Sequence, residues 1–138
     1  MIRIGYNELK DFTWGVLGAV GLDDFSRGAV TTGLCETSLR GVDSHGIRLL
    51  PHYAAAAISG RKNPTPRLAF TRTFPAMGRL EADNGFGQAA GMKAIECGLK
   101  MAAETGLGAV GVVNSSHPGA MASMALKAAR EGYMALAL

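Results

Sequence analysis

Two prolines near the middle of the chain, Pro64 and Pro66, limit its possible folds more than any other feature. A proline biases the preceding residue towards extended backbone and lacks the amide hydrogen of a helix interior, so no helix crosses residues 63–66 (NPTP). The hydrophobic period also changes here, from helical spacing to strands alternating with helices. We therefore divide the chain into a helical segment, residues 1–63, and a partial α/β domain, residues 64–138.

The first segment has the apolar spacing of three helices. We predict helices over residues 8–20, 24–39 and 47–59, the last with Pro51 in its early turns. Polar residues that favour helix starts precede each of them. The expected caps are Asn7 for the first helix, Asp23 or Asp24 for the second, and Asp43 or Ser44 for the third.

The second segment predicts the element order β-β-α-β-α-β, which assigns the chain to the α/β class. The expected strands cover residues 68–74, 77–83, 107–113 and 133–138, the third of them buried, and the expected helices cover residues 87–105 and 118–130. The chain stops inside the apolar run 133–138, whereas termini usually end in polar residues. We therefore expect an incomplete α/β sandwich, truncated at the C-terminus.

Composition excludes several classes of protein. A chain of 138 residues suits one ordinary domain, and 48% hydrophobic residues exclude disorder. The net charge of +3 is scattered, and its longest basic run is Arg61-Lys62, so we expect neither a nucleic-acid nor a membrane partner. Cys35 and Cys97 belong to no Cys/His cluster, so we expect no metal site but two buried, reduced thiols in a cytoplasmic protein.

A glycine-rich turn is the first segment that could carry chemistry. Residues 83–91 (DNGFGQAAG) stand between a predicted strand and a predicted helix, where backbone amides can meet a phosphate. Their spacing, GxGxxxG, does not match the dinucleotide fingerprint GxGxxG. We favour the structural interpretation, in which Gly85 forms a turn while Gly87 and Gly91 allow close helix packing.

Two further segments place a histidine at a junction between elements. Residues 41–48 (GVDSHGIR) contain His45 and Arg48, a common acid/base and a side chain that grips carboxylates. Residues 114–119 (NSSHPG) follow a predicted strand, where α/β proteins often bind ligands. The alternative in both cases is helix capping, by Ser116 or His117 in the second segment. His52, beside Pro51 in a helix, gives no specific signal.

A hydrolase that uses Ser44 as its nucleophile is a weaker interpretation. Adjacent residues rarely place a hydroxyl on the neighbouring imidazole, and the chain has no GxSxG elbow.

Together these segments resemble the malate/L-lactate dehydrogenase type 2 family, which includes ureidoglycolate and sulfolactate dehydrogenases. Residues 39–46 (LRGVDSHG) are similar to the signature RGVDSHG and are followed by residues 50–53 (LPHY) and 60–64 (GRKNP). Residues 83–88 (DNGFGQ) are similar to the turn DNGxGQ, and residues 108–117 to a segment that contains VxNSxH. The motifs occur in the family's order along the whole chain.

The resemblance implies an NAD(P)-dependent oxidoreductase that interconverts small 2-hydroxy and 2-oxo acids, with a non-Rossmann fold and as a homodimer. His45 and His117 match histidines assigned to proton transfer. Ser44, Arg48 and Tyr53 are expected to bind the substrate, Arg48 by clamping its carboxylate. Many members carry that arginine one position later, where this chain has Leu49. The choice between NAD and NADP and the cofactor-binding residues stay unassigned.

We expect His45 and His117 to converge on one pocket, with their imidazoles no more than about 12 Å apart. Family members are well over twice as long as this chain, so we expect the isolated 138 residues to be inactive. The alternative from another class is a catalytically silent fragment or interaction module that retains only the family's N-terminal elements.

Overall fold

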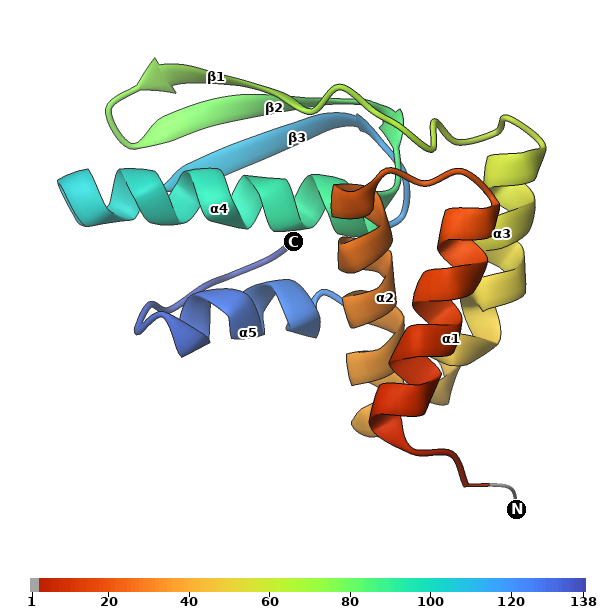
Figure 1. The fold of residues 1–138 in the computed structure, drawn as a ribbon. Helices are drawn as coiled ribbons and strands as arrows, with labels where there is room; N and C mark the ends of the chain where they lie inside the picture. Colours follow the sequence, from red (N-terminus) through yellow and green to blue (C-terminus); the bar gives the residue numbers. More distant parts are fainter. Residues whose placement is uncertain (1–2) are drawn as a thin grey trace.

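A computed structural model describes residues 3–138, and in that part of the chain helices cover one face of a small sheet (Figure 1). The first helices are α1 (Tyr6–Ala19), α2 (Asp24–Leu39) and α3 (Leu50–Ile58), which lie side by side. Two 3-10 turns, Asp43–His45 and Ile47–Leu49, join α2 to α3. The predicted helical segment is confirmed.

The sheet follows the two prolines. Its strands are β1 (Ala69–Phe74), β2 (Met77–Gly85) and β3 (Ala109–Ser115), in the order β1-β2-β3. β1 and β2 form an antiparallel hairpin, while β3 pairs parallel to β2. The parallel pair needs a crossover, which α4 (Gly87–Thr105) supplies along the sheet, and α5 (Ala122–Arg130) follows β3. The α/β class is confirmed.

One buried cluster joins both sequence segments. It contains Leu17 of α1, Leu34 of α2 and Tyr53 of α3, together with Phe86 and Ala89 from the start of α4. Burial of such side chains is the main favourable term in folding, so this cluster stabilises the docking of the helices against the sheet. The division into residues 1–63 and 64–138 stays a prediction.

The predicted helix starts are partly confirmed. Asp23 caps α2, where its carboxylate accepts a hydrogen bond of 2.8 Å from the Ser26 amide. The cap predicted at Asn7 is wrong, because α1 begins at Tyr6 and Asn7 lies inside its first turn. Neither Asp43 nor Ser44 caps α3, since the 3-10 turns intervene and α3 starts only at Leu50, with Pro51 in its first turn.

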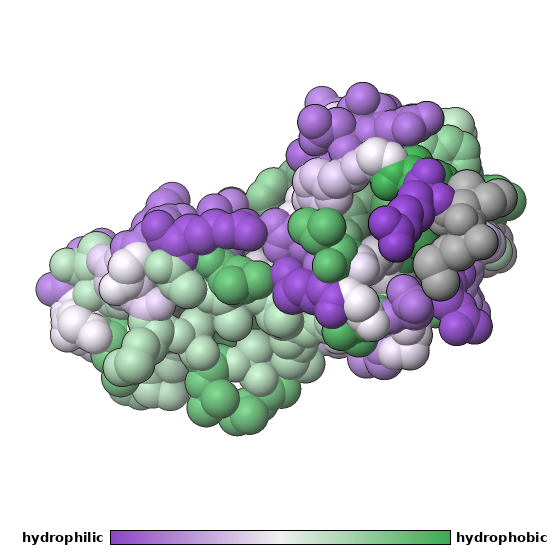
Figure 2. All heavy atoms as spheres, turned by 90° about the horizontal axis from the view of Figure 1, so that it is seen from below, coloured by the Kyte–Doolittle hydropathy of each residue, from purple (hydrophilic) through white to green (hydrophobic). Residues whose placement is uncertain are grey.

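Three predictions for the C-terminal part need correction. β3 is mostly exposed rather than buried, because it lies at the edge of the sheet. α5 begins at Ala122 rather than at residue 118. Residues 133–138 form no strand, since they pair with no strand of residues 3–138, and their Met134, Leu136 and Leu138 are exposed. In Figure 2 hydrophobic atoms cover much of the half on which Figure 1 has α5 and this segment, with hydrophilic atoms along its upper edge.

The glycine-rich turn serves close packing, as favoured above. A Cβ on Gly87 would lie 2.7 Å from the carbonyl oxygen of His117, and one on Gly91 would meet the Met124 thioether. Gly85 also has a packing role, since a Cβ there would lie 2.7 Å from the Pro66 ring. The left-handed backbone is instead adopted by Asp83 (φ 50) and Asn84 (φ 54).

Within residues 3–138, no helix is long and apolar enough to span a bilayer, and no cluster of potential metal ligands occurs. Cys35 and Cys97 are free thiols, the first buried and the second half-buried.

Candidate functional site

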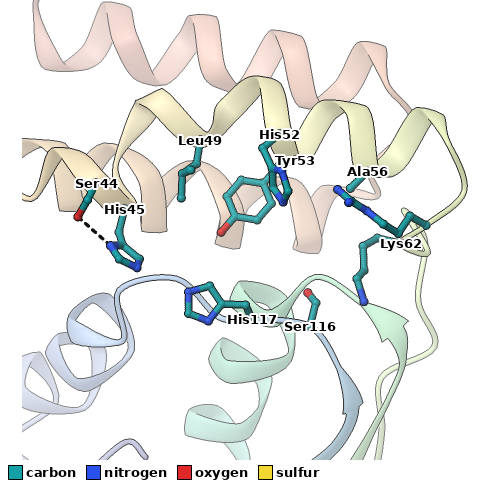
Figure 3. Close-up of a pocket in the computed structure, with 10 residues that line it drawn as sticks. Ser44, His45, Leu49, His52, Tyr53, Ala56, Lys62, Ser116 and His117 are labelled. Carbon is teal, nitrogen blue, oxygen red and sulfur yellow. Dashed lines mark hydrogen bonds between the residues drawn. The ribbon is translucent and has the colours of Figure 1, made fainter.

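A cavity of about 580 Å³ lies where the helical segment meets the loop that follows β3 (Figure 3). Its volume is within the range of roughly 300–1,000 Å³ that is usual for small-molecule sites. All three histidines of the chain line it. The lining residues are Ser44, His45, Leu49, His52, Tyr53, Ala56, Arg61, Lys62, Ser116 and His117.

The imidazoles of His45 and His117 meet at this cavity. Their ring centroids lie 5.7 Å apart with the rings edge to face, and Figure 3 shows the two side chains pointing towards each other. The convergence predicted from the sequence is confirmed. One small molecule can touch both rings.

The turn that carries His45 is fixed by α2. The Ser38 hydroxyl accepts a hydrogen bond of 2.8 Å from the Ile47 amide. Gly46 packs so closely on α2 that a Cβ there would lie 3.2 Å from the Ser38 Cα. The side chain of Ser38 thus holds the backbone just after His45 in place.

The loop that carries His117 is fixed by the glycine-rich turn. The Ser116 hydroxyl accepts a 2.9 Å hydrogen bond from the Gly87 amide and donates a 3.3 Å bond to the Gly85 carbonyl. Ser116 therefore ties its loop to the start of α4 and does not cap α5. Asn114, near the end of β3, has a φ of 51, a strained value that turns the chain into this loop.

Ser44 contacts its own neighbour, contrary to the expectation from the sequence. Its Oγ lies 2.9 Å from Nδ1 of His45, because the 3-10 turn brings the two adjacent side chains together. This bond sets the orientation of the ring and leaves Nε2 for other partners.

Tyr53 and Arg48 occupy different environments. Tyr53 is buried and lines the cavity, with its ring edge-on to Phe86 at 6.0 Å. Arg48 is exposed and does not line the cavity, while Leu49 does. Of the five predicted site residues, the structure thus brings together Ser44, His45, Tyr53 and His117.

Of the ionisable residues that line the cavity, the sequence analysis did not assign three to the site: His52, Arg61 and Lys62. A signal for His52 was present, because residues 45, 49, 52, 53 and 56 recur at the i, i+4, i+7, i+8 spacing of one helix face. Arg61 and Lys62 were considered as part of the overall charge and of the segment 60–64 (GRKNP), without a role in the site. No local pattern indicated that their loop borders the cavity.

The backbone of residues 61–63 is tied to the glycine-rich turn. The side-chain amide of Asn84 donates to the Arg61 carbonyl at 3.1 Å, and its oxygen accepts from Lys62 Nζ at 2.9 Å. The Asn63 amide donates to the Asn84 carbonyl at 3.0 Å. Asn84 therefore positions the only two consecutive cations of the chain at the edge of the cavity.

The same contacts show whether the glycine-rich turn can bind the phosphates of a dinucleotide. The Gly87 amide at the head of α4, which a phosphate would need, is already bonded to Ser116. The Asn84 side chain is likewise used by the neighbouring loop. The turn does not fit a phosphate cradle, whereas the cavity fits a small acid beside an imidazole pair.

The sequence is similar to those of known dehydrogenases. The profile of the malate/L-lactate dehydrogenase family matches residues 4–138. Malate dehydrogenase of Pyrococcus abyssi is 36% identical over 137 residues, which cover 99% of this chain and 38% of that protein. Ureidoglycolate dehydrogenase (NAD(+)) of Escherichia coli K12 is 28% identical over 137 residues, which cover 99% of this chain and 39% of that protein.

Solved structures show the same fold. The structure of malate dehydrogenase from Pyrococcus horikoshii OT3 superimposes with a TM-score of 0.90 at 35% identity, covering 95% of this chain and 38% of that one. Sulfolactate dehydrogenase from Methanocaldococcus jannaschii gives 0.88 at 28% identity, covering 94% and 38%. This chain thus spans a little over a third of the length of these relatives, and over that span it belongs to the malate/L-lactate dehydrogenase family.

Proposed function

We propose that the complete protein that carries this chain is an NAD(P)-dependent oxidoreductase. It interconverts a small 2-hydroxy acid and its 2-oxo acid, with a histidine as the acid/base. The observation that carries the proposal is the pair of imidazoles 5.7 Å apart at a cavity sized for a small molecule. A cytoplasmic homodimer, expected from the sequence, belongs to the same proposal.

In this proposal the imidazole pair transfers the proton of the reaction. The nicotinamide, when bound, supplies or accepts the hydride at the substrate carbon, and the oxygen on that carbon must gain or lose a proton. When Nδ1–H of His45 donates to the Ser44 hydroxyl oxygen, Nε2 can carry the second proton of an imidazolium and give it to the oxygen of a 2-oxo acid, which leaves a neutral ring. In the reverse direction Nε2 accepts it. His117 then orients the same oxygen by hydrogen bonding, or the two exchange roles.

Ser44 and Tyr53 bind the substrate from either side of this pair. Arg48 is proposed as the clamp of the carboxylate next to the reacting carbon, which requires its exposed side chain to turn towards the bound acid. Within residues 3–138, its guanidinium makes no hydrogen bond or ion pair that would oppose this rotation.

The test uses the complete protein and the change in nicotinamide absorbance with a panel of 2-oxo acids. Ala at the true acid/base, His45 or His117, should depress kcat by about a hundredfold or more. Ala at the other position should mainly raise KM. His52→Ala, which removes the third imidazole of the cavity, is the comparison and should lower kcat by less than about tenfold.

Other outcomes would contradict the proposal. If both His45→Ala and His117→Ala keep more than about a tenth of the wild-type kcat, neither ring moves the proton. If the wild-type protein turns over no 2-oxo acid, the silent fragment or interaction module is favoured. Covalent labelling of Ser44 by a fluorophosphonate would favour a hydrolase, which the 2.9 Å contact between Ser44 and His45 makes worth testing.

A further inference from the structure

Gln88, the second residue of α4, is buried with an unsatisfied side-chain amide. It is 3% exposed, and its Oε1 is a buried atom without a hydrogen-bond partner among residues 3–138. A buried amide oxygen without a partner destabilises the folded state, and a methionine of about the same length would avoid that cost. Packing alone therefore does not account for an amide at this position, and buried polar atoms of this kind often belong to functional sites.

Two glycines fix the course of this side chain. A Cβ on Gly33 of α2 would lie 3.1 Å from Cγ of Gln88, so the glycine makes room for the stem of the side chain. At the other end, a Cβ on Gly119 would lie 3.1 Å from Nε2. The side chain thus runs from α2 to the loop that carries His117, and its amide lies beside that loop.

The hydroxyl of Tyr53 reaches the same place from α3. A Cβ on Gly119 would lie 3.5 Å from Oη of Tyr53, so this hydroxyl and Nε2 of Gln88 lie on the same side of Gly119. Tyr53 also lines the cavity, and Figure 3 shows its ring projecting towards the loop of His117. Within residues 3–138, no hydrogen bond uses either the Tyr53 hydroxyl or the Gln88 amide.

The chemistry of the two groups sets the direction of a hydrogen bond between them. The amide nitrogen of Gln88 only donates, whereas the Tyr53 hydroxyl both accepts and donates. When Oη accepts from Nε2, its own proton is directed away from Gln88 and is left for an oxygen in the cavity. Hydrogen bonds of a site are often long before a ligand binds and shorten in the complex.

We propose that Gln88 is a positioning residue, which holds the Tyr53 hydroxyl so that it donates to an oxygen of the bound acid. The inference rests on the proposed function and adds to it a residue that does not line the cavity. Gln88 acts through Tyr53 and not on the substrate itself. The unpaired Oε1 is the cost of keeping a donor on the other side of the same amide.

The experiment is a double-mutant cycle on the complete protein. It compares the wild type, Gln88→Met, Tyr53→Phe and the double variant in nicotinamide-absorbance kinetics with a 2-oxo acid. Both substitutions remove hydrogen-bonding groups with little change in size. The control is Thr31→Val, which removes another buried oxygen without a partner from a residue that does not line the cavity.

We expect Gln88→Met and Tyr53→Phe each to raise KM by about tenfold, the equivalent of one hydrogen bond to a charged group, with kcat within about threefold of the wild type. The double variant should raise KM no further than the larger single effect, because both substitutions break the same chain of hydrogen bonds. The melting temperature of Gln88→Met should equal or exceed that of the wild type, and Thr31→Val should leave the kinetics unchanged.

Three results would overturn the inference. If the double variant raises KM by the product of the two single effects, Gln88 does not act through Tyr53. If Gln88→Met melts at a lower temperature or does not fold, Gln88 serves the fold, and if KM is unchanged it has no part in binding. Each of these results leaves the proposed function standing, whereas a wild-type protein that reduces no 2-oxo acid would refute both.

Discussion

Gly87→Ala tests whether the start of α4 sets the position of His117. Gly87 packs against the loop that carries this histidine, and an added Cβ would lie 2.7 Å from both the carbonyl carbon and the carbonyl oxygen of His117. These atoms belong to the backbone, so they cannot rotate away as the end of a side chain can. Since carbon atoms prefer contacts of about 3.5–4.0 Å, the loop must move by roughly 1 Å.

This displacement sets the expected loss of kcat and of stability. A shift of about 1 Å in a reacting group can lower a rate by about 10²-fold. Forcing one methyl group into a packed contact should also lower the free energy of unfolding by about 1–3 kcal/mol. We therefore expect Gly87→Ala to remain folded at low temperature and to lose about 10²-fold in kcat, because the imidazole pair no longer meets the substrate correctly.

The assay is kcat of the complete protein, measured by nicotinamide absorbance well below the melting temperature of the variant. Circular dichroism at the same temperature confirms the native state. Gly111→Ala is the matched control, because Gly111 lies on β3 before the same loop and a Cβ there would meet no atom within 4 Å. A folded Gly87→Ala protein with kcat within about threefold of the wild type would refute the reasoning.

Three further predictions concern stability. Burial raises the pKa of the Cys35 thiol above its usual value of 9.0, so at a pH just above 9.0 the thiol is ionised in the unfolded state and still neutral in the folded state. The free energy of unfolding, measured by urea titration, should therefore fall as the pH rises through 9.0, and it should fall less in Cys35→Ala. An equal dependence on pH in the two proteins would contradict the assignment. Arg130 of α5 donates a 3.0 Å hydrogen bond to the Glu36 carboxylate on α2, so Glu36→Gln should lower the free energy of unfolding by about 1 kcal/mol. If the loss of this pair is the cause, adding Arg130→Ala to Glu36→Gln should lower the melting temperature little further. Asn84→Gly keeps the backbone angle but removes the amide that bonds Lys62 and the Arg61 carbonyl. The variant should lose about 1–2 kcal/mol in the free energy of unfolding, and an unaltered melting temperature would argue against a role of Asn84 in fixing this loop.

The elements with a strong hydrophobic period were predictable, and their ends were less so. α2 and α4 match their predicted ranges because an N-cap or a glycine marks their limits. The strand expected at residues 133–138 did not form, since apolar composition alone supplies no partner for the backbone groups of a strand. The burial expected for β3 failed for a related reason: burial depends on its place at the edge of the sheet.

The candidate site was predictable where family motifs marked it. His45 and His117 were identified through polar junctions and the resemblance, and the structure brings them together. Arg61 and Lys62 lie in the segment 60–64 of the resemblance, but no role was assigned to them, because a basic pair in a loop has the same sequence pattern whether it faces solvent or a cavity. Their place follows from bonds to Asn84, more than twenty positions away, which no local pattern encodes.

The histidine pair also constrains how this chain can be recombined with its relatives. The two rings come from opposite sides of the proline-rich loop, and one buried cluster packs residues of both segments together. A chimaera joined at residues 63–66 would combine Leu34 and Tyr53 of one parent with Phe86 of another, and a mismatch in that core would alter the distance between the imidazoles. Exchange of whole segments therefore puts the acid/base pair at risk. Point changes in the cavity-lining loop that carries Arg61 and Lys62 do not touch this core, so they leave the geometry of the histidine pair intact.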